Sequence, residues 1–433
     1  MNEINPQEVH TTNATLASEP AIRAARNAVA QEGIDKLSVD RDLVRELTTA
    51  TSHKLDKWGA ANQKASGRCW IFAGLNSLRG DIMDRTNIKD FELSQTYLYF
   101  YDKLEKANWF LTAVDELKDR DITDRTLTKL MDDPIGDGGQ WSMFVSLVEK
   151  YGVVPKYAMP ETASSEASAM LNRNLQTVLR RAAHQIRAGK SGAQEHALAD
   201  VYRILTANLG LPPTDFKWQY RDKDDNFHRE GTFTPQDFAR EYLPKDLGEY
   251  VCVVNDPRNN YGELYTVDYL GNVAGEKVTY LNAPVEVLRD ATRSAIEDGQ
   301  PVWFGCDTSQ QSDADSGVWA KRLHDYEGLY GVEMGIEKPD RLRLHESLMT
   351  HAMVFTGADI AEGGDVTRWR VENSWGTEKG DKGFWTMADD WFDEYVFEIA
   401  VHPSRLPEQY QEALKSAEIT TLPAWDPMGA LAN

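Results

Sequence analysis

One cysteine, Cys69, stands at the start of a run whose apolar residues follow helical spacing. The first of them is followed by others four, seven and eleven positions later: Ile71, Leu75, Leu78 and Ile82. This spacing predicts a helix of roughly three or more turns that begins near Cys69. The positive end of such a helix lowers the pKa of a thiol, and Lys64 and Arg68 add positive charge beside it. We therefore expect a helix that carries a nucleophilic thiolate at its N-terminus.

Gln63 lies six residues before Cys69, in Gln-Lys-Ala-Ser-Gly-Arg-Cys-Trp. A side-chain amide at this distance can donate a hydrogen bond to the carbonyl oxygen that a thiolate attacks, and so can the Cys69 backbone N–H. The sequence therefore predicts an oxyanion hole built from these two donors.

Two later segments supply a general base and a group that orients it. His351 opens an apolar, strand-like run, and Asn373 ends another one and precedes Ser-Trp-Gly. With the order Cys, His, Asn, one ring nitrogen of His351 is expected to face the sulfur while the other bonds the Asn373 amide oxygen. Trp375 would shield that bond from water. The predicted catalytic residues are thus Cys69, His351, Asn373 and Gln63.

Each of these residues, taken alone, also has an ordinary structural explanation. Most lone cysteines are small buried apolar residues, which is our interpretation of Cys252 and Cys306. Asn373 by itself could be a turn residue before Gly376. The remaining histidines have no matching partner motif and are interpreted as structural: His10, His53, His184, His196, His228, His324, His345 and His402. Only the joint occurrence of the three segments favours catalysis.

The residues Gln63, Gly67, Cys69, Trp70 and His351, with Asn-Ser-Trp-Gly at Asn373–Gly376, resemble the papain superfamily of cysteine peptidases. Longer blocks resemble, more specifically, the bleomycin hydrolase and bacterial aminopeptidase C family: Asn62–Asn76, Phe91–Phe110, Gly136–Trp141, Tyr151–Pro155, Pro301–Asp307 and Pro423–Ala432. The resemblance runs from about residue 50 to the end of the chain.

The resemblance to this family implies a cysteine aminopeptidase that forms a homo-hexamer with active sites facing an interior cavity. It also implies that Gly138 and Gly139 line the substrate channel, where missing side chains let a peptide backbone lie close. In the family, the C-terminal tail enters the active site and its carboxylate binds the substrate's free amino group. Here that carboxylate would belong to Asn433, or to Ala432 after trimming, and Asn433 departs from the lysine expected at the last position. Two prolines predict an extended tail, although composition alone favours a disordered one.

The distance between the catalytic residues indicates a large insertion. Cys69 and His351 are 282 positions apart, against ~130–150 in papain-type chains. Helical patterns at Ser165–Ala188 and Ala193–Leu209 place much of the extra chain between Glu161 and Leu243. Strand patterns follow at Tyr250–Val254, Tyr265–Leu270, Val278–Leu281, Val302–Cys306, Ala352–Phe355, Thr367–Val371, Gly383–Met387 and Val396–Val401.

The expected fold class is α+β, a papain-like two-lobed peptidase with a helical lobe, a β-rich lobe, a helical insertion and a C-terminal arm. We expect five segments in chain order: an N-terminal extension (1–50), the helical lobe with the nucleophile (51–160), the mainly helical insertion (161–248), the β-rich lobe with His351 and Asn373 (249–403) and the arm that reaches the active site (404–433).

Composition argues against several other classes of protein. A net charge of −22 without a basic run disfavours nucleic-acid binding. No window approaches the ~20 apolar residues of a membrane span, and the first residues do not resemble a signal peptide. Three cysteines cannot form a disulfide framework, so we expect a cytoplasmic protein. Metal-binding and nucleotide-binding motifs are absent from the sequence, and we expect no cofactor.

The function that these patterns favour is a cytoplasmic cysteine aminopeptidase that acts on peptides with a free N-terminus through a thioester acyl-enzyme. One alternative is an endopeptidase of the same chemistry, if the tail does not reach the cleft. The other is a catalytically silent binding scaffold, against which the complete set of cysteine, histidine, asparagine and glutamine argues.

Overall fold

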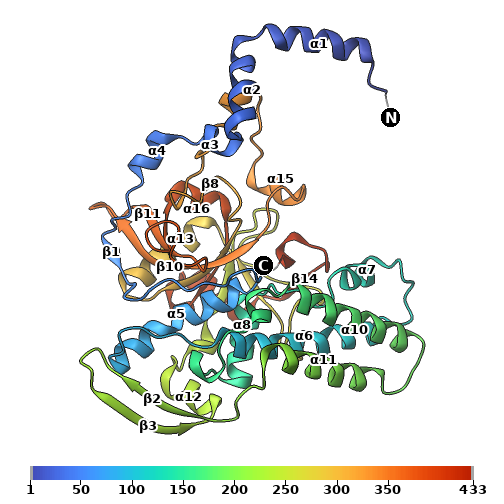
Figure 1. The fold of residues 1–433 in the computed structure, drawn as a ribbon, viewed down its shortest axis with the longest axis vertical. Helices are drawn as coiled ribbons and strands as arrows, with labels where there is room; N and C mark the ends of the chain where they lie inside the picture. Colours follow the sequence, from blue (N-terminus) through green and yellow to red (C-terminus); the bar gives the residue numbers. More distant parts are fainter. Residues whose placement is uncertain (1–2, 431–433) are drawn as a thin grey trace.

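The computed structural model describes residues 3–430 and shows a papain-like α+β fold in which a helical lobe packs against a large sheet (Figure 1). The helical half contains α5 (Cys69–Thr86), α6 (Gln95–Glu116), α7 (Arg125–Asp132), α8 (Trp141–Tyr151), α9 (Ala163–Glu166), α10 (Ala169–Arg187), α11 (Ala193–Leu209) and α12 (Pro235–Tyr242).

Helix α5 begins at Cys69, as its apolar spacing predicts. It ends where Asn87 adopts a left-handed conformation at φ 56°, a common way to terminate a helix. Burial extends beyond the apolar residues that predicted the helix, because Arg79 and Asn76 are also buried. A helix enclosed on all sides lies inside the protein, and α5 fills the space between the helical lobe and the sheet.

Helices α10 and α11 of the insertion pack against α6. The predicted bounds of α11, Ala193 and Leu209, are both correct. Gly210, with φ 88°, terminates the helix. The prediction of one continuous helix over Ser165–Ala188 is wrong, because the chain breaks between α9 and α10. At the break, the Ala65 N–H donates to the Glu166 carbonyl (2.9 Å) and the Ser168 N–H donates to the Ala65 carbonyl (3.3 Å). These groups therefore bond the segment before Cys69 instead of continuing the helix.

A β-hairpin, which the helical patterns did not predict, also belongs to this region. Strands β2 (Phe216–Arg221) and β3 (Phe227–Phe233) pair antiparallel and lie beside α12 (Figure 1). Phe216 and Trp218 are buried, while Lys217 between them and Gln219 after them are exposed. This alternation is the usual sequence signal of a half-buried strand.

The sheet of the second half has twelve strands among the described residues 3–430, in the order β14-β5-β6-β4-β13-β7-β10-β11-β12-β9-β8 with β1 beside β10. Their bounds are β1 (His53–Lys54), β4 (Val251–Val254), β5 (Leu264–Val267), β6 (Tyr280–Asn282), β7 (Val302–Cys306), β8 (Ser312–Asp313), β9 (Val318–Trp319), β10 (His351–Ile360), β11 (Val366–Glu372), β12 (Phe384–Ala388), β13 (Val396–Val401) and β14 (Ile419–Leu422). The predicted strands are all present, and those at β7 and β13 match to the residue.

Side chains alternate between the two faces of the central strand β10. Ala352 and Val354 join the core shared with α5, whereas Met353 and Phe355 join a second core. That second core also contains residues of α13 (Val285–Glu297) and α16 (Asp389–Tyr395). Because successive side chains of a strand point to opposite faces, β10 binds the two layers together.

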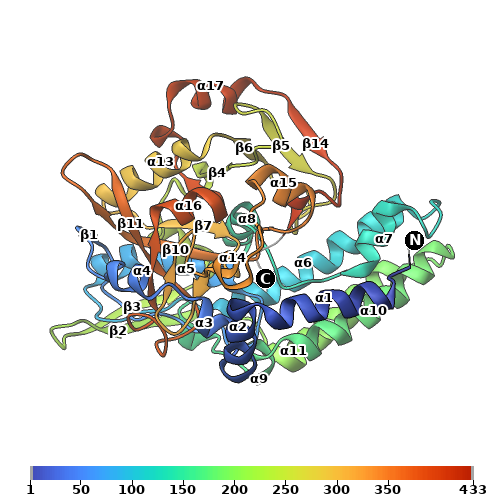
Figure 2. The ribbon, with the colours of Figure 1, turned by 90° about the horizontal axis from the view of Figure 1, so that it is seen from above.

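The N-terminal end of the described chain lies on the outside of this body (Figures 1 and 2). Helices α1 (Pro6–Ser18) and α2 (Pro20–Glu32) form an arm that projects from it, followed by α3 (Ile34–Ser38) and α4 (Arg41–Glu46) (Figures 1 and 2). Short helices α14 (Tyr326–Tyr330) and α15 (Lys338–Arg343) lie between β9 and β10 in the chain, and α17 (Glu408–Ser416) precedes β14.

Beyond β14, the chain turns at Ala424–Trp425, where the Asp426 N–H donates to the Pro423 carbonyl (2.8 Å), and again in a 3₁₀ turn at Pro427–Gly429. The prediction of an extended tail is therefore wrong for much of the stretch from Pro423 to Ala430, which contains two turns.

Candidate active site

Cys69 is the first residue of α5 and is completely buried. The backbone N–H groups of Ala352, Trp70 and Cys69 lie near its sulfur and act to lower the pKa of the thiol. Burial acts in the opposite direction and is the larger effect, so that the pKa of the thiol rises to about 12. Because the Ala352 N–H reaches the sulfur, Cys69 lies at the start of β10, next to His351.

His351 and Asn373 lie at the same end of two paired strands. His351 is the first residue of β10, and Asn373 directly follows the antiparallel strand β11. The His351 Nε2 is 3.0 Å from the Asn373 Oδ1, and the Ser374 N–H donates to that same oxygen (2.7 Å). Since the amide oxygen is an acceptor, Nε2 carries the hydrogen, and Nδ1 of the neutral ring is the basic nitrogen.

Trp375 covers this pair. Its ring lies 5.0 Å from the His351 ring, centre to centre, and it is 37% exposed. The histidine itself is buried, and burial lowers its pKa to about 4 although the bond to Asn373 acts in the opposite direction. The site between the sheet and α5 is thus largely shielded from water.

Burial therefore favours the neutral form of Cys69 and of His351 when each is considered alone. The expectation that the helix N-terminus and nearby cations produce a standing thiolate stays a prediction, and burial, which raises the pKa of the Cys69 thiol, opposes it. A thiolate and an imidazolium formed together offset each other's charge. Proton transfer from the sulfur to the ring leaves the net charge of the site unchanged.

The Gln63 side chain is buried. Both the nitrogen and the oxygen of its side-chain amide form hydrogen bonds. The Gln63 Nε2 donates to the Ser66 carbonyl (2.5 Å), and the Ser374 hydroxyl donates to the Gln63 Oε1 (2.5 Å). The Gln63 backbone N–H also donates to the Ser374 carbonyl (2.8 Å). Ser374 therefore links Gln63 to Asn373, and its place in the Asn-Ser-Trp-Gly motif was the available sequence signal for this role.

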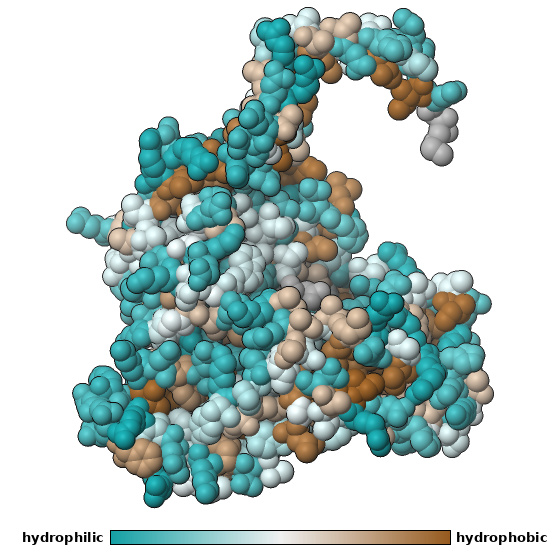
Figure 3. Space-filling model, in the orientation of Figure 1, coloured by the Kyte–Doolittle hydropathy of each residue, from teal (hydrophilic) through white to brown (hydrophobic). Residues whose placement is uncertain are grey.

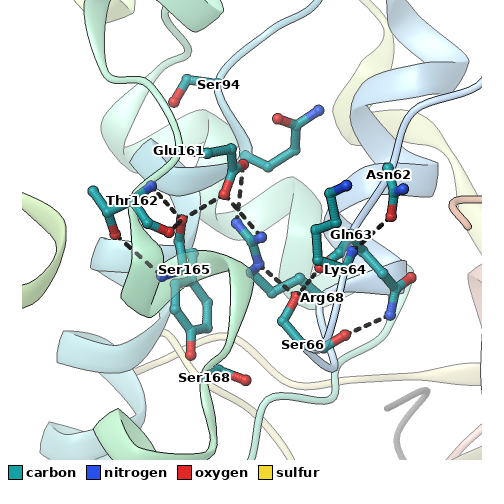
Figure 4. Close-up of polar contacts among 12 residues, drawn as sticks. Asn62, Gln63, Lys64, Ser66, Arg68, Ser94, Glu161, Thr162, Ser165 and Ser168 are labelled. Atoms are coloured by element: carbon teal, nitrogen blue, oxygen red, sulfur yellow. Dashed lines mark hydrogen bonds and ion pairs between the residues drawn. The ribbon is translucent and has the colours of Figure 1, made fainter. Parts of the chain in front are cut away.

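The structure gives Arg68 a different position from the one expected. Its guanidinium is completely buried and forms an ion pair with Glu161, with 2.9 Å between Nη2 and Oε2 (Figure 4). It is not among the groups that shift the pKa of Cys69. Lys64 is exposed, in a left-handed conformation at φ 55°. The positive charge of Arg68 is thus neutralised on the side of the insertion.

The Gly138–Gly139 segment packs tightly against the nucleophile helix. A Cβ built on Gly139 would lie 2.4 Å from the indole of Trp70, so that only glycine fits without displacement. The indole N–H of Trp70 donates to the Asp137 carbonyl (2.8 Å), and the Lys106 Nζ donates to the Gly138 carbonyl (2.6 Å). This loop is therefore fixed directly beside Cys69.

Asp137 is a buried residue of the same loop that the sequence analysis missed. Its carboxylate pairs with Lys103 (2.7 Å) and accepts from the Gly67 N–H (3.1 Å). Burial raises its pKa, but Lys103 and hydrogen bonds from Ser168 and Asn172 outweigh that effect and hold the pKa well below its usual range. No local pattern could have identified Asp137, because its partners come from three separate parts of the chain.

The C-terminal arm passes close to this loop. The Gln140 Nε2 donates to the Ala430 carbonyl (3.2 Å), and the Tyr280 hydroxyl donates to the Met428 carbonyl (3.2 Å). Arg258 and Asp426 form an ion pair at 2.8 Å. The two residues predicted to bind the substrate's amino group, Ala432 and Asn433, lie outside the described residues.

Cys252 and Cys306 are buried in β4 and β7, as expected of structural cysteines. Among residues 3–430, no three His, Cys, Asp or Glu side chains are grouped so that they could hold a metal ion. In the same range, no helix has the length and hydropathy that crossing a bilayer would require.

A thiol, an imidazole with a free Nδ1 and an amide that orients the ring, in this order on a two-lobed α+β fold, define a papain-like cysteine peptidase. The chain belongs to the Peptidase C1-like family, whose sequence model matches residues 3–429. The protein is thus a hydrolase of the cysteine-peptidase type.

Individual relatives extend over almost the whole chain. The aminopeptidase C of Lactobacillus delbrueckii subsp. lactis is 39% identical over 445 residues, and the bleomycin hydrolase of Homo sapiens is 39% identical over 451 residues; each alignment covers 99% of both chains. The crystal structure of PepW from Lactobacillus rhamnosis HN001 is 40% identical, with a TM-score of 0.96 over 99% of both chains. The resemblance stated from the sequence motifs is therefore confirmed.

Proposed function

We propose that the protein is a cysteine aminopeptidase that removes residues one at a time from the free N-terminus of peptides. Relatives named aminopeptidase C support the activity. The observation that carries the exopeptidase assignment is the bond between Gln140 and Ala430, which brings the C-terminal arm to the Gly138–Gly139 loop. We propose that the terminal carboxylate that follows this arm binds the ammonium group of the substrate.

In the proposed reaction, the Cys69 sulfur transfers its proton to the His351 Nδ1 and attacks the carbonyl carbon of the first peptide bond. The Cys69 N–H and the Gln63 amide donate to the oxygen as it becomes negative. His351 then donates its proton to the leaving amine, the C–N bond breaks, and a thioester remains. Water, deprotonated by His351, hydrolyses the thioester and returns the proton to the sulfur.

The geometry of Gln63 fits this role in the oxyanion hole. Its amide has two hydrogens, and the bond to the Ser66 carbonyl uses one of them. The Ser374 hydroxyl fixes the other end of the amide, so the second hydrogen has a defined direction. Asn373 would keep the His351 ring in the plane that presents Nδ1 to the sulfur.

Replacing Gln63 by alanine should lower kcat by ~10²–10³ with little change in KM, because the donor is needed mainly after charge develops on the oxygen. Steady-state kinetics on an aminoacyl fluorogenic amide would measure both constants. Asn373→Ala should have a milder effect, since the cysteine and histidine remain. Full activity of the glutamine variant would remove Gln63 from the oxyanion hole without affecting the nucleophile assignment.

The experiment that tests the exopeptidase assignment compares matched dipeptide amides with a free or an N-acetylated terminus. We expect a strong preference for the free amine, because acetylation removes the charge that the tail carboxylate would bind. Equal rates on both substrates would favour the alternative, an endopeptidase of the same chemistry. Absence of hydrolysis on either substrate would favour a binding scaffold.

We further propose that the protein is a homo-hexamer, as its resemblance to the bleomycin hydrolase family implies, and its projecting arm fits a contact between copies of the chain. Helix α1 has no buried residue, and apolar side chains on the arm are exposed, among them Ile4, Val9 and Leu16 (Figure 3). An isolated helix of this length is marginally stable in water, so a second copy of the chain is the expected partner. Light scattering should give about six times the mass of one chain, and a monomer at micromolar concentration would contradict this part of the proposal.

We also propose a cytoplasmic location. Cys69, Cys252 and Cys306 are free and buried, which agrees with a reducing compartment in which thiols persist.

A further inference from the structure

Arg68, five residues after Gln63, forms a buried ion pair with Glu161. Arg68 and Glu161 are 0% and 14% exposed, and the Arg68 Nη1 also donates to the Glu161 Oε1 at 3.2 Å. The guanidinium lies 5.1 Å from the Phe72 ring and 5.3 Å from the Tyr99 ring. A buried arginine requires a negative partner, and Glu161 fills this need from the chain segment that leads into the insertion.

Hydrogen bonds connect this ion pair to the Gln63 amide through Ser66. The Arg68 Nε donates to the Ser66 hydroxyl (2.9 Å), which in turn donates to the Gln63 carbonyl (2.6 Å) (Figure 4). The Ser66 carbonyl then accepts the bond from the Gln63 Nε2 (2.5 Å). Because a hydroxyl has a single hydrogen, these two bonds fix its direction and with it the turn from Gln63 to Ser66.

Glu161 is itself held in place by the start of the insertion. The Ser165 hydroxyl donates to the Glu161 Oε2 (2.5 Å), and Thr162 caps α9 together with Ser165. The Thr162 hydroxyl also donates to the Asn208 carbonyl at the end of α11 (2.9 Å). Burial raises the pKa of Glu161, but Arg68 and Ser165 outweigh that effect and lower the pKa. Its carboxylate therefore stays ionised at neutral pH.

We propose that Glu161, Arg68 and Ser66 are positioning residues for the reaction, which hold the Gln63 amide at the angle where its second hydrogen meets the oxyanion. This inference rests on the proposed role of Gln63. It gives the insertion a part in catalysis, since Glu161 and the residues that hold it are the first residues of that segment. In this proposal, Arg68 acts through Ser66 and Gln63.

The test is a double-mutant cycle between Glu161→Gln and Gln63→Ala, with kcat, KM and thermal melting measured for all four proteins. Glu161→Gln keeps the size of the side chain and removes its charge. In the wild-type background it should lower kcat about tenfold and leave KM within about twofold, because the loss concerns the transition state. In the Gln63→Ala background it should change kcat by less than about twofold, because the group through which it acts is gone.

Two further variants separate positioning from fold stability. Ser66→Ala breaks the connection without leaving an unpaired buried charge, so it should lower kcat to a similar extent even if Glu161→Gln folds poorly. Glu394→Gln is the matched control, because Glu394 is 20% exposed and pairs with Arg341 at 2.8 Å between α15 and α16. It should lower the melting temperature and leave kcat unchanged.

The outcomes distinguish the inference from the proposed function. If Gln63→Ala is impaired but Glu161→Gln and Ser66→Ala are not, or if they lower kcat equally in both backgrounds, the positioning role is wrong and the oxyanion role of Gln63 stands. If Gln63→Ala retains full kcat, the oxyanion assignment fails and the positioning role fails with it.

Discussion

Replacing Cys69 by alanine should abolish peptide hydrolysis and leave the protein folded. The sulfur forms the covalent intermediate, so its loss removes the acyl-enzyme pathway as a whole. Alanine is well tolerated in a helix, and removal of one buried sulfur creates a small cavity that costs about 1 kcal/mol. We expect turnover on an aminoacyl amide to fall to background, while the melting temperature changes by no more than about 4 °C.

Cys252→Ala is the matched control for this experiment. Cys252 is also a free, buried thiol, and burial raises its pKa well above the ordinary value. It lies in β4, where the Ser142 hydroxyl is 3.3 Å from its sulfur. The control variant should keep its turnover and lose at most a little stability. Retained activity in Cys69→Ala would place the nucleophile elsewhere and reopen the roles of Cys252 and Cys306.

Removing Met428–Asn433 should change the enzyme from an exopeptidase into an endopeptidase. The deletion eliminates the residues that bond Tyr280 and Gln140, and it moves the terminal carboxylate back to Pro427. A shielded pair of ammonium and carboxylate contributes a few kcal/mol, which corresponds to a preference of about 10² or more for free over acetylated substrates. The truncated protein should lose most of this preference and cut N-blocked and longer peptides internally.

Two measurements keep this test informative if the deletion disturbs the fold. Alkylation of Cys69 should proceed in the truncated protein, because Cys69, His351 and Asn373 are unchanged. Gln140→Ala, which removes the bond to Ala430 and the bond that Gln140 accepts from the Tyr280 hydroxyl, should reduce the preference for free amines partially. If the full-length enzyme already cleaves acetylated peptides as fast as free ones, and the deletion changes nothing, the tail does not restrict the substrate.

The sequence was sufficient for those features that depend on neighbouring residues. The 3.6-residue period after Cys69 and the Gly-Pro signals after Leu209 located α5 and α11, and strand patterns located β7 and β13. The Cys, His and Asn segments, read together, indicated the family. Each of these signals lies within a short stretch of chain, where spacing and side-chain type determine the local backbone.

Only the tertiary structure showed the features that depend on burial or on contacts between residues far apart in the sequence. Arg68 and Glu161 are 93 positions apart, so the sequence could not show that the arginine is neutralised. The break between α9 and α10 arises because backbone groups there bond Ala65. Likewise, the enclosed position of Cys69 and His351 makes desolvation larger than the effect of the helix N-terminus. The residue types and spacing therefore determined the chemistry of this protein, whereas the charge state and positioning of its reactive groups were decided only when the chain folded, because electrostatic energies depend on burial and three-dimensional distance.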